Sequence, residues 1–483
     1  MAISSIQELL AGMSGPIDGP DVTVSGVAYR SDRVRPGDAF FCIPGFAHDG
    51  HDYAADAVDR GATVLVVQRE LDDVGDVVQV NVADARVALA YASSAIYGYP
   101  SRDMRIVGIT GTNGKTTTAY LADSILRATG AKTGLIGTVE TKIADQCRDA
   151  GRTTPESADL NSLLAEMCEE GVSSAVMEVS SHAIDLHRVD GVHFEVAAFT
   201  NLSQDHLDYH HTLEEYFSVK RRLFTEMDVA KRVINIADPL GAGMAAEIED
   251  AITVGAEDAD IHARDVALSA EGSRFILVTP AGEVEVDLPL AAPFNVSNAL
   301  VAAGCAHALA IPLASIVVGL EHAPQVPGRL ERITTDQPFS VFVDYAHTPD
   351  SLEKAIGAVR EITEGRVLVV FGCGGDRDPE KRPLMGRTVA EGADHAIVTS
   401  DNPRSEDPIG IILQIEDGMR EGPASYEVEI DRRKAIAAAM CQAAPSDAVL
   451  IAGKGHEDYQ IFADRTVHFD DREVAREELT ARC

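Results

Sequence analysis

The feature that most constrains the fold is a glycine-rich turn between an apolar run and a helix pattern. Residues 108–117 read GITGTNGKTT and continue the apolar run that starts at Met104. This pattern predicts a β-strand, a tight turn and a helix from Lys115 to about Thr129. In such a turn the backbone N–H groups can close around phosphate oxygens, and the helix N-terminus adds a favourable field. A phosphate loop on an α/β sheet is therefore the starting hypothesis.

The side chains of this turn favour a nucleotide. Lys115 can neutralise charge on the β- and γ-phosphates, and the hydroxyl of Thr116 suits Mg²⁺. The strict Walker spacing is not met, because its first glycine would fall on Ile109. A glycine-rich strand–helix turn with a chance lysine is the alternative, but the strand before and the helix after favour phosphate binding. The residues expected to bind ATP here are Gly111, Thr112, Asn113, Gly114, Lys115, Thr116 and Thr117.

Chain length and segments rich in proline and glycine indicate how the chain divides into domains. A chain of 483 residues exceeds what one hydrophobic core usually organises, so two or three domains are expected. Boundaries rich in proline and glycine fall at residues 97–101 and 324–328, which predicts domains at 1–100, 101–327 and 328–483. Strand patterns alternating with helices indicate an α/β fold with mostly parallel sheets. These strands are expected at 22–27, 63–67, 77–80, 104–110, 175–178, 195–200, 233–236, near 341, and at 367–371, 396–399 and 448–451.

Composition and charge exclude several kinds of partner. The formal net charge of -36 would repel nucleic acid and anionic membranes, so anionic substrates must be held by local cations and backbone amides. Seven cysteines without a CxxC pair argue against a secreted disulfide framework. The N-terminus lacks a basic segment followed by an apolar core, and the apolar stretch 301–320 is broken by His307 and Pro312. We therefore expect a cytoplasmic protein with no membrane insertion.

Two segments downstream of the phosphate loop offer metal ligands. MEVSSH, residues 177–182, ends an apolar strand, so Glu178 would project toward the loop and offer a hard oxygen to Mg²⁺. TNLSQDHLDYH, residues 200–210, adds His206, with Asp205 as a nearby carboxylate. Taken singly, each has a plain explanation as a solvated carboxylate or a structural histidine.

The loop TGTNGKTT resembles that of the Mur ligase superfamily, which includes folylpolyglutamate synthetases and cyanophycin synthetases. These enzymes phosphorylate a substrate carboxylate and let an amine displace the phosphate. The resemblance implies a small N-terminal α/β domain, a central P-loop ATPase-like domain with a mostly parallel sheet, and a C-terminal Rossmann-like domain. It also implies that Thr116, Glu178 and His206 bind Mg²⁺.

Lys220, in YFSVKRRLF (residues 216–224), is assigned a function only by this resemblance. On composition Lys220 is one cation on a basic helical face. The Mur ligase lysine at this place is carbamylated by CO₂, so the resemblance implies an N6-carboxylysine. Carbamylation needs a neutral amine, and the resulting anion could support Mg²⁺ at the transferring phosphoryl group. The catalytic residues expected are Lys115, Glu178, His206 and Lys220.

Motifs near residue 328 resemble the family's other nucleotide contacts. In FNVSN, residues 294–298, Asn295 and Asn298 match positions that contact the base, although two asparagines at a helix start are otherwise plausible caps. Arg329, at the domain boundary, matches an arginine that reaches the phosphates. Asp344, in DYAHTP, matches an aspartate that contacts the ribose.

The N-terminal motifs resemble the uridine-nucleotide domain of tripeptide-forming Mur ligases. RSDR at residues 30–33 and GFAHDGHD at 45–52 carry this likeness, although the usual Asp-Ser-Arg stands here as Arg30-Ser31-Asp32. RTTP at 152–155 matches a stretch that contacts the sugar-peptide substrate. The substrate contacts implied are Ser31, Thr153, Thr154, Ser180 and Arg188.

The C-terminal motifs point to the amino acid that is added. GCGGDRD (372–378), DNPRSE (401–406) and GKGHE (453–457) gather cations and carboxylates on loops after strands. In the family, DNPR marks members that add meso-diaminopimelate. Arg404 can bind the second carboxylate of that amino acid bidentately, Glu457 can pair with its distal ammonium, and lysine would leave Arg404 unmatched. The contacts expected are Arg377, Asp401, Asn402, Arg404, Gly453 and Glu457.

The resemblance as a whole implies a ligase of peptidoglycan precursor synthesis that uses ATP and Mg²⁺, and we expect a monomer. It would join meso-diaminopimelate to the D-glutamate of UDP-MurNAc-L-Ala-D-Glu through an acyl phosphate. The alternatives are the same reaction with L-lysine or another diamino acid, a folylpolyglutamate-type ligase, and a non-catalytic nucleotide-binding regulator.

Overall fold

The computed structural model describes residues 4–13 and 15–481, so Cys483 lies outside the described residues. Internal contacts divide the chain into two compact units. The first comprises Met1–His262, Thr279–Ala281 and Asn298–Gly319, and the second comprises Ala263–Val278, Gly282–Ser297 and Leu320–Cys483. The six described cysteines are free thiols.

The first unit begins with a five-stranded sheet in the order β2-β7-β6-β5-β4. All neighbours are parallel except β2 and β7, and helix α3 packs against β4, β5 and β6. Asp84 caps α3 by accepting hydrogen bonds from the N–H groups of Arg86 and Val87. The strands are β2 (Ile17–Asp18), β4 (Gly26–Ala28), β5 (Asp38–Phe41), β6 (Val64–Val67) and β7 (Val78–Val82), and β1 (Ser4–Ser5) pairs with β3 (Thr23–Val24). The helices are α1 (Ile6–Leu10), η1 (Ser31–Arg33), η2 (Gly50–Tyr53), α2 (Ala54–Asp59), α3 (Ala85–Ile96) and η3 (Pro100–Arg102).

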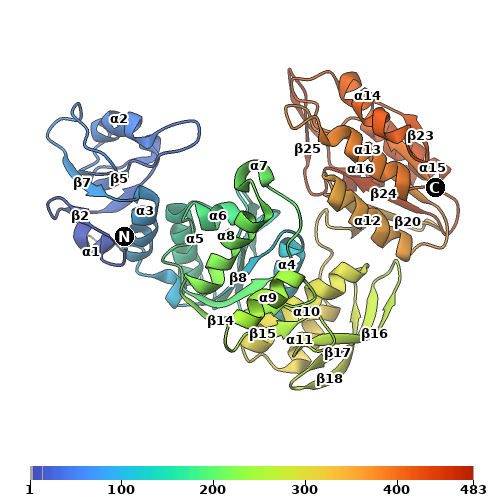
Figure 1. The fold of residues 1–483 in the computed structure, drawn as a ribbon, viewed down its shortest axis with the longest axis horizontal. Coiled ribbons are helices and arrows are strands. Elements are labelled where there is room, and N and C mark those ends of the chain that lie inside the picture. The colour runs from blue at the N-terminus through green and yellow to red at the C-terminus, as the bar shows by residue number, and fades with distance from the viewer. Residues whose placement is uncertain (1–3, 14, 482–483) are drawn as a thin grey trace. The chain divides into compact units, whose positions relative to one another are not determined.

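An eight-stranded sheet follows in the order β11-β10-β9-β12-β8-β13-β14-β15. The six strands from β9 to β15 are parallel, and β10 and β11 run antiparallel at one edge. Figure 1 shows helices around this sheet; α4 packs over β8, β9 and β12, while α8 and α9 pack on β14. Residues 106–110 of β8 are all buried, as expected for a parallel strand covered on both faces.

The bounds of β8, β12 and β13 lie within one residue of the expected strands, whereas β14 begins four residues before the expected start at 233. The strands are β8 (Arg105–Thr110), β9 (Thr133–Ile136), β10 (Glu140–Ile143), β11 (Gln146–Asp149), β12 (Ser174–Glu178), β13 (Phe194–Phe199), β14 (Val229–Asn235) and β15 (Ile252–Val254). The helices are α4 (Lys115–Ala128), α5 (Ser157–Glu169), α6 (Ser181–Asp185), α7 (Leu207–His210), α8 (Leu213–Thr225) and α9 (Pro239–Glu247).

The next segment holds a small sheet and two helices. Strands β16 (His262–Leu268), β17 (Ser273–Thr279) and β18 (Gly282–Leu288) form a three-stranded sheet. The apolar stretch 301–320 lies in helix α10 (Pro293–Ala308), a turn, and helix α11 (Leu313–Glu321). The broken stretch therefore forms two helices. No helix among the described residues is long and apolar enough to cross a membrane.

The second unit contains a six-stranded sheet in the order β19-β20-β24-β21-β22-β23, parallel except at β19. Its strands are β19 (Glu331–Arg332), β20 (Ser340–Asp344), β21 (Val367–Phe371), β22 (His395–Val398), β23 (Ser425–Val428) and β24 (Ala448–Ala452), and β25 (Tyr459–Ile461) pairs with β26 (Thr466–His468). Its helices are α12 (Pro349–Glu361), α13 (Lys381–Gly392), α14 (Pro408–Met419), α15 (Arg432–Gln442) and α16 (Asp471–Ala481). Separate hydrophobic clusters cover the two faces of this sheet. The predicted α/β class with mostly parallel sheets is confirmed.

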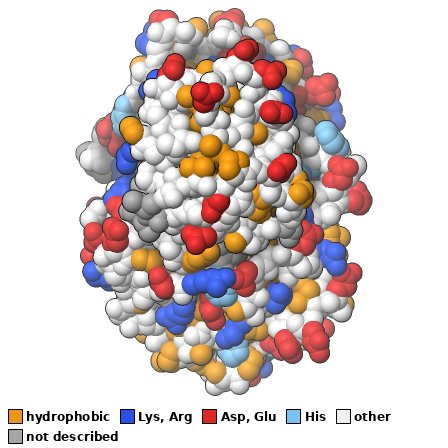
Figure 2. Space-filling view, turned by 90° about the vertical axis from the view of Figure 1, so that its left-hand side faces the viewer, with side chains coloured by type: hydrophobic (Ala, Val, Ile, Leu, Met, Phe, Trp, Pro, Cys, Tyr) orange, Lys and Arg blue, Asp and Glu red, His pale blue; other side chains and the backbone are white. Residues whose placement is uncertain are grey.

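Acidic side chains are scattered over the face of the molecule that Figure 2 shows. Lys and Arg side chains lie among these Asp and Glu side chains. Scattered charge of this kind favours solubility and does not itself define a binding patch.

Candidate functional site

The glycine-rich turn closes tightly between β8 and α4. Gly114, the residue before α4, has φ +83°, and Gly111 has φ +147°, both in the region that favours glycine. A Cβ on Gly111 would lie 1.9 Å from Oγ1 of Thr200, and one on Gly114 would lie 2.2 Å from Oδ1 of Asn298. Both positions therefore require glycine for space as well as for conformation.

Neighbouring segments hold the turn in shape. The backbone N–H of Asn113 donates to Oδ1 of Asn201 at 3.1 Å, and its side-chain amide donates to Oγ of Ser203 at 3.0 Å. Oγ1 of Thr112 accepts from the N–H of Ser203 at 3.0 Å and lies 3.4 Å from the hydroxyl of Tyr216. The loop is thus fixed by bonds to the segment after β13, which makes it rigid enough to receive a phosphate chain.

Two lysines meet one backbone carbonyl in this loop. Nζ of Lys115 donates to the carbonyls of Gly111 at 3.0 Å and Thr112 at 2.9 Å, and Nζ of Lys220 donates to the Gly111 carbonyl at 2.8 Å. The Lys220 side chain is 1% exposed and its Nζ lies 4.5 Å from the ring centroid of Tyr216. Burial, together with the nearby Lys115 charge, holds the pKa of Lys220 well below its usual range. This environment makes the Lys220 amine easier to deprotonate than the amine of an exposed lysine.

The carboxylate of Glu178 lies at the end of β12 beside the first turn of α4. It accepts from Oγ1 of Thr116 at 2.9 Å, from the N–H of Thr138 at 2.7 Å and from Oγ1 of Thr138 at 3.1 Å, and Glu178 is 1% exposed. A buried carboxylate and a hydroxyl are hard oxygen donors, which fit Mg²⁺. The described residues hold no group of three or more His, Cys, Asp or Glu placed for a metal, so phosphate and water oxygens would complete such a site.

His206 lies in a cluster of aromatic and imidazole rings. It begins α7 with φ +53°, its side chain is 47% exposed, and its ring centroid lies 4.9 Å from that of His182 and 6.2 Å from that of Tyr216. Since Tyr216 also contacts Lys220 and Thr112, His206 stands at the outer side of the same loop.

Four of the five expected substrate residues lie together. Oγ1 of Thr154 donates to the carbonyl of Glu178 at 2.8 Å and accepts from the N–H of Ser180 at 3.2 Å. The hydroxyl of Thr153 lies 3.0 Å from that of Thr138, and Nη1 of Arg188 donates to the carbonyl of Thr154 at 3.2 Å. These contacts connect the RTTP segment directly to the Glu178 strand.

The fifth residue, Ser31, lies in η1 of the N-terminal sheet region. Beside it, Nη2 of Arg30 and Oδ2 of Asp32 form an exposed ion pair at 2.7 Å. In the order found here, the two charged residues that flank Ser31 therefore pair with each other.

The second unit holds the expected residues near position 328. The carboxylate of Asp344 accepts from the N–H groups of Leu330 at 2.6 Å and Ala346 at 2.8 Å, while burial raises its pKa. The guanidinium of Arg329 lies 4.8 Å from the ring centroid of Tyr345. At the start of α10, Nδ2 of Asn295 donates to the carbonyl of Ala291 at 2.7 Å, and in the first unit Oδ1 of Asn298 accepts from Thr118 at 3.5 Å. Asn295 therefore makes a local contact at the start of α10, whereas Asn298 bonds a residue of α4 that lies 180 positions earlier in the chain.

The three C-terminal motifs converge on loops at the carboxyl ends of β21, β22 and β24. Nδ2 of Asn402 donates to Oε2 of Glu457 at 2.9 Å, and Nη1 of Arg404 donates to the carbonyl of Gly375 at 2.7 Å. Gly453 has φ +118°, and a Cβ there would lie 2.7 Å from Oδ2 of Asp401. Burial raises the pKa of Glu457. Arg377 stays exposed, with Nη1 donating to the carbonyl of Asp376 at 3.2 Å.

An ion pair between buried Arg382 and partly exposed Glu406 helps to connect two of these loops. The guanidinium of Arg382 bonds both carboxylate oxygens of Glu406, at 2.9 and 2.8 Å, and also donates to Gln414 at 3.0 Å. The carboxylate of Glu406 accepts from the N–H of Asp376 at 2.6 Å, and Oδ1 of Asp376 accepts from Ser405 at 2.6 Å. The loop with Arg377 and the loop with Arg404 are therefore fixed to each other.

Several neighbours of these residues were not singled out from sequence. Thr138 and Tyr216 carry no motif of their own, and only folding places them against Glu178 and Lys220. Lys454 lies within the quoted GKGHE motif; it is fully buried, and its Nζ lies 3.7 Å from Oε2 of Glu457. A charged residue at the end of an apolar strand was the available signal for Lys454.

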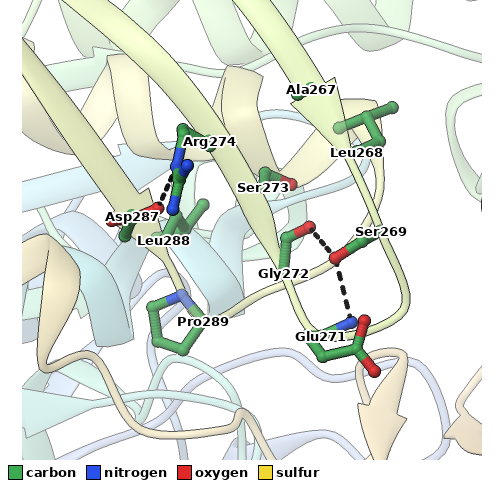
Figure 3. A pocket seen from close by; sticks show the side chains of 10 residues that line it. All are labelled: Ala267, Leu268, Ser269, Glu271, Gly272, Ser273, Arg274, Asp287, Leu288 and Pro289. Atoms are coloured by element: carbon green, nitrogen blue, oxygen red, sulfur yellow. Dashed lines mark hydrogen bonds and ion pairs between the residues drawn. The ribbon is translucent and has the colours of Figure 1, made fainter.

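A hollow of about 440 Å³ lies elsewhere, on the small sheet of β16, β17 and β18. Figure 3 shows its lining, in which Arg274 pairs with Asp287 and the backbone N–H of Glu271 bonds Ser269. None of the residues expected at the nucleotide or amino-acid sites lines this hollow.

A glycine-rich loop that opens a helix at the edge of a mostly parallel sheet defines a nucleotide-binding α/β protein. Family models match three successive parts of the chain: the Mur ligase family catalytic domain at residues 23–106, the Mur ligase middle domain at 109–306, and the Mur ligase glutamate ligase domain at 328–455. With relatives 45% identical over nearly its whole length, the chain belongs to the Mur ligase family, whose members are ATP-dependent ligases.

Two relatives illustrate the match. The UDP-N-acetylmuramoyl-L-alanyl-D-glutamate–2,6-diaminopimelate ligase of Bacillus licheniformis is 45% identical over 467 residues, covering 95% of this chain and 94% of the relative. The enzyme of the same name from Gloeobacter violaceus is 46% identical over 467 residues, covering 96% and 95%.

Solved structures agree on the fold. A structure of UDP-N-acetylmuramoyl-L-alanyl-D-glutamate–2,6-diaminopimelate ligase superposes with a TM-score of 0.73 at 29% identity, covering 100% of this chain and 99% of that one. MurF from Acinetobacter baumannii gives a TM-score of 0.65 at 23% identity, covering 99% of both chains, and supports the fold alone.

Proposed function

We propose that this ligase joins meso-diaminopimelate to the D-glutamate of UDP-MurNAc-L-Ala-D-Glu, with ATP converted to ADP and phosphate. The observation that carries this proposal is the loop cluster around Arg404, where a half-buried guanidinium lies on loops that also carry Asn402 and Glu457. The names of relatives that align over nearly the full chain support the same substrate pair.

We propose three domains for the three ligands. Residues 1–100 would bind the uridine part of the substrate, 101–327 would bind ATP, and 328–483 would bind the amino acid. Because one chain supplies all three candidate sites, we also propose that it acts as a monomer. Because its proposed substrates are small polar metabolites, we propose a cytoplasmic location.

The ATP-binding part of the proposal rests on the phosphate loop. A carboxylate is a poor acyl donor to amines, so it must first become an acyl phosphate. The loop residues, Gly111 to Thr117, would surround the phosphates, with Lys115 leaving the two carbonyls it now bonds to pair with phosphate oxygens. Further nucleotide contacts are proposed for Asn295, Asn298, Arg329 and Asp344.

Mg²⁺ fits the oxygen donors of Thr116 and Glu178, with His206 proposed nearby. When bound, the ion would neutralise charge on the phosphates during transfer. The chain's own contribution is a carboxylate already oriented by Thr116 and Thr138. Little reorganisation is therefore needed when the site is filled.

We propose that Lys220 carries a CO₂-derived carbamate. Its nitrogen would bond the carbon of CO₂ and release one proton, giving an anion at a buried position. The proposal is supported by burial of the amine and by the lowered pKa of Lys220, which favours the nucleophilic neutral form.

The proposed reaction has two bond-forming steps. An oxygen of the D-glutamate side-chain carboxylate bonds the γ-phosphorus of ATP and ADP leaves. The amine of diaminopimelate then bonds the acyl carbon, phosphate leaves, and the nitrogen loses a proton. Ser31, Thr153, Thr154, Ser180 and Arg188 are proposed to orient the uridine-linked substrate, so that proximity supplies much of the rate.

The amino-acid contacts are proposed on the C-terminal loops. Arg404, with Arg377 nearby, would bind the carboxylate of the second amino-acid head. Glu457 would bind its ammonium, supported by Asp401, Asn402 and the close backbone at Gly453.

Phosphate release with ATP, Mg²⁺ and UDP-MurNAc-L-Ala-D-Glu tests the proposal, with meso-diaminopimelate or L-lysine added in parallel. We expect stimulation by diaminopimelate alone and a tripeptide product by mass spectrometry. Stimulation by lysine alone would refute the assignment of Arg404, and no stimulation by either would favour a different ligase or a nucleotide-binding regulator.

A further inference from the structure

A single buried carboxylate gathers three guanidinium groups beside the phosphate-loop sheet. Oε1 of Glu156 lies 2.7 Å from Nη1 of Arg152 and 2.9 Å from Nη2 of Arg188, and Oε2 lies 3.5 Å from Nη1 of Arg86. The Glu156 side chain is 9% exposed. We call these four residues the Glu156 cluster.

The three arginines come from separate parts of the first unit. Arg86 lies in the first turn of α3 and also donates to the carbonyl of Pro44 at 3.3 Å, next to the GFAHDGHD motif. Arg152 belongs to the RTTP segment before α5, and Arg188 follows α6. Glu156 therefore fixes three otherwise independent side chains in one place.

Charge makes the cluster unusual in this chain. Three guanidiniums face one carboxylate, so the cluster keeps a positive excess although the chain has a net charge of -36. Arg188 is partly desolvated, which lowers its pKa, and its buried Nε has no hydrogen-bond partner among the described residues. Pre-placed cations with spare donors suit an anionic oxygen group, which accepts from guanidinium N–H groups.

We propose that Glu156 is a positioning residue for the uridine-nucleotide substrate. It holds the guanidiniums of Arg188 and Arg152 so that their remaining N–H groups meet a phosphate or carboxylate of that ligand. This inference rests on the proposed function, since it assumes the UDP-linked substrate as the ligand. Glu156 does not touch the ligand in this arrangement but sets the direction of the groups that do.

If Glu156 served only to join α5 to the N-terminal sheet region, loss of another contact between these regions should weaken binding equally. The same turn of α5 carries Asp159, which accepts from the hydroxyl of Tyr29 at 2.6 Å and lies 3.5 Å from Nη1 of Arg33. Asp159 thus also joins α5 to the N-terminal sheet region, but it takes no part in the Glu156 cluster. Asp159→Asn is therefore the matched control for loss of contact between these two regions.

The direction in which Glu156→Gln changes substrate affinity distinguishes a positioning role from an effect of net charge. Glu156→Gln keeps the size of the side chain and removes one negative charge, so a site governed by net charge alone would bind an anion more tightly. A site that needs oriented guanidiniums would bind it more weakly. We expect binding of UDP-MurNAc-L-Ala-D-Glu to weaken by about ten-fold or more, since small displacements of binding groups have large effects.

The experiment is titration calorimetry of the full-length protein with UDP-MurNAc-L-Ala-D-Glu, with melting temperatures measured in parallel. We expect Glu156→Asp to bind with intermediate affinity, and Asp159→Asn to stay within about two-fold of the wild type because the cluster is intact. Glu166→Gln, a change on α5 that affects the exposed pair with Arg148 of β11, serves as the surface control. Since Arg152 is 58% exposed, Arg152→Gln provides a variant that folds, and we expect a few-fold weaker binding.

Two results would overturn the inference while the wild type still binds the nucleotide. One is unchanged or tighter binding by Glu156→Gln and Arg152→Gln, and the other is an equal loss in Asp159→Asn. Failure of the wild type to bind the nucleotide would overturn the proposed function and this inference with it.

Discussion

Replacing Arg404 tests how the amino acid is chosen. Nη1 of Arg404 donates to the carbonyl of Gly375 at 2.7 Å, and its backbone N–H donates to the carbonyl of Ile461 at 3.0 Å, which leaves the other edge of the guanidinium for a ligand. A bidentate bond to a carboxylate comprises two hydrogen bonds to charged groups, worth together about 3–4 kcal/mol. At about 1.4 kcal/mol per decade, Arg404→Met should lower kcat/KM for meso-diaminopimelate by roughly 10²–10³-fold.

The assay is phosphate release with the product identified by mass, using meso-diaminopimelate and L-lysine side by side. L-lysine lacks the second carboxylate, so the low rate expected with it should not fall further. Arg404→Lys keeps the charge but not the fork, and we expect an intermediate loss. Arg387→Met, which removes only an exposed pair with Glu421, is the control. An equal loss with both amines, or full activity with diaminopimelate, would refute the reasoning.

Three further outcomes follow from buried charged groups. Lys220→Ala should keep ATP binding, lose turnover by roughly 10³-fold or more and regain part of it with short-chain carboxylic acids, whereas full activity would exclude a required carbamate. Because burial raises the pKa of Glu457, its ionised form is lost early as pH falls; KM for meso-diaminopimelate should rise as pH drops through that pKa, and Glu457→Gln should abolish this dependence. A KM for meso-diaminopimelate that does not change with pH in the wild type would contradict this role of Glu457. Arg432 bonds Asp471 through two contacts of 2.7 Å, and both side chains are fully buried. In urea denaturation, Arg432→Met should therefore lower the free energy of unfolding by about 3–5 kcal/mol, and the double variant Arg432→Met with Asp471→Leu should recover most of that loss. An unchanged free energy of unfolding in Arg432→Met would argue against a stabilising role for this pair.

The sequence predicted the strands well because they are buried on both faces. Val367–Phe371 is an uninterrupted apolar run that becomes β21 with the same bounds, and the run ending at Thr110 becomes β8. Strands β16 and β18 carry many exposed positions, so no run of buried residues marked them. Strand β17 does alternate between buried and less buried positions, but no strand was predicted there. The order of strands in each sheet also depends on pairings between distant segments, which periodicity cannot supply.

The site was predictable where residues act in a local motif and not where they act through space. Lys115 and the loop glycines follow from one ten-residue segment. The bond between Thr116 and Glu178 spans 62 positions, and Thr138 joins the same carboxylate from a bend with no pattern of its own. Glu156 looks like an ordinary acidic residue after a proline, and only folding shows that three arginines converge on it. The roles of these residues in binding stay predictions.

The crowding around Gly111 and Gly114 bears on how this protein could escape an inhibitor. A side chain at either position would collide with Thr200 or Asn298, and both backbones adopt conformations that other residues rarely tolerate. A compound that makes its main contacts with the backbone of this turn would therefore meet two positions at which resistance mutations cannot arise without loss of the loop itself. Resistance to such a compound would therefore have to arise at positions outside the two glycines, where a side-chain change is sterically possible.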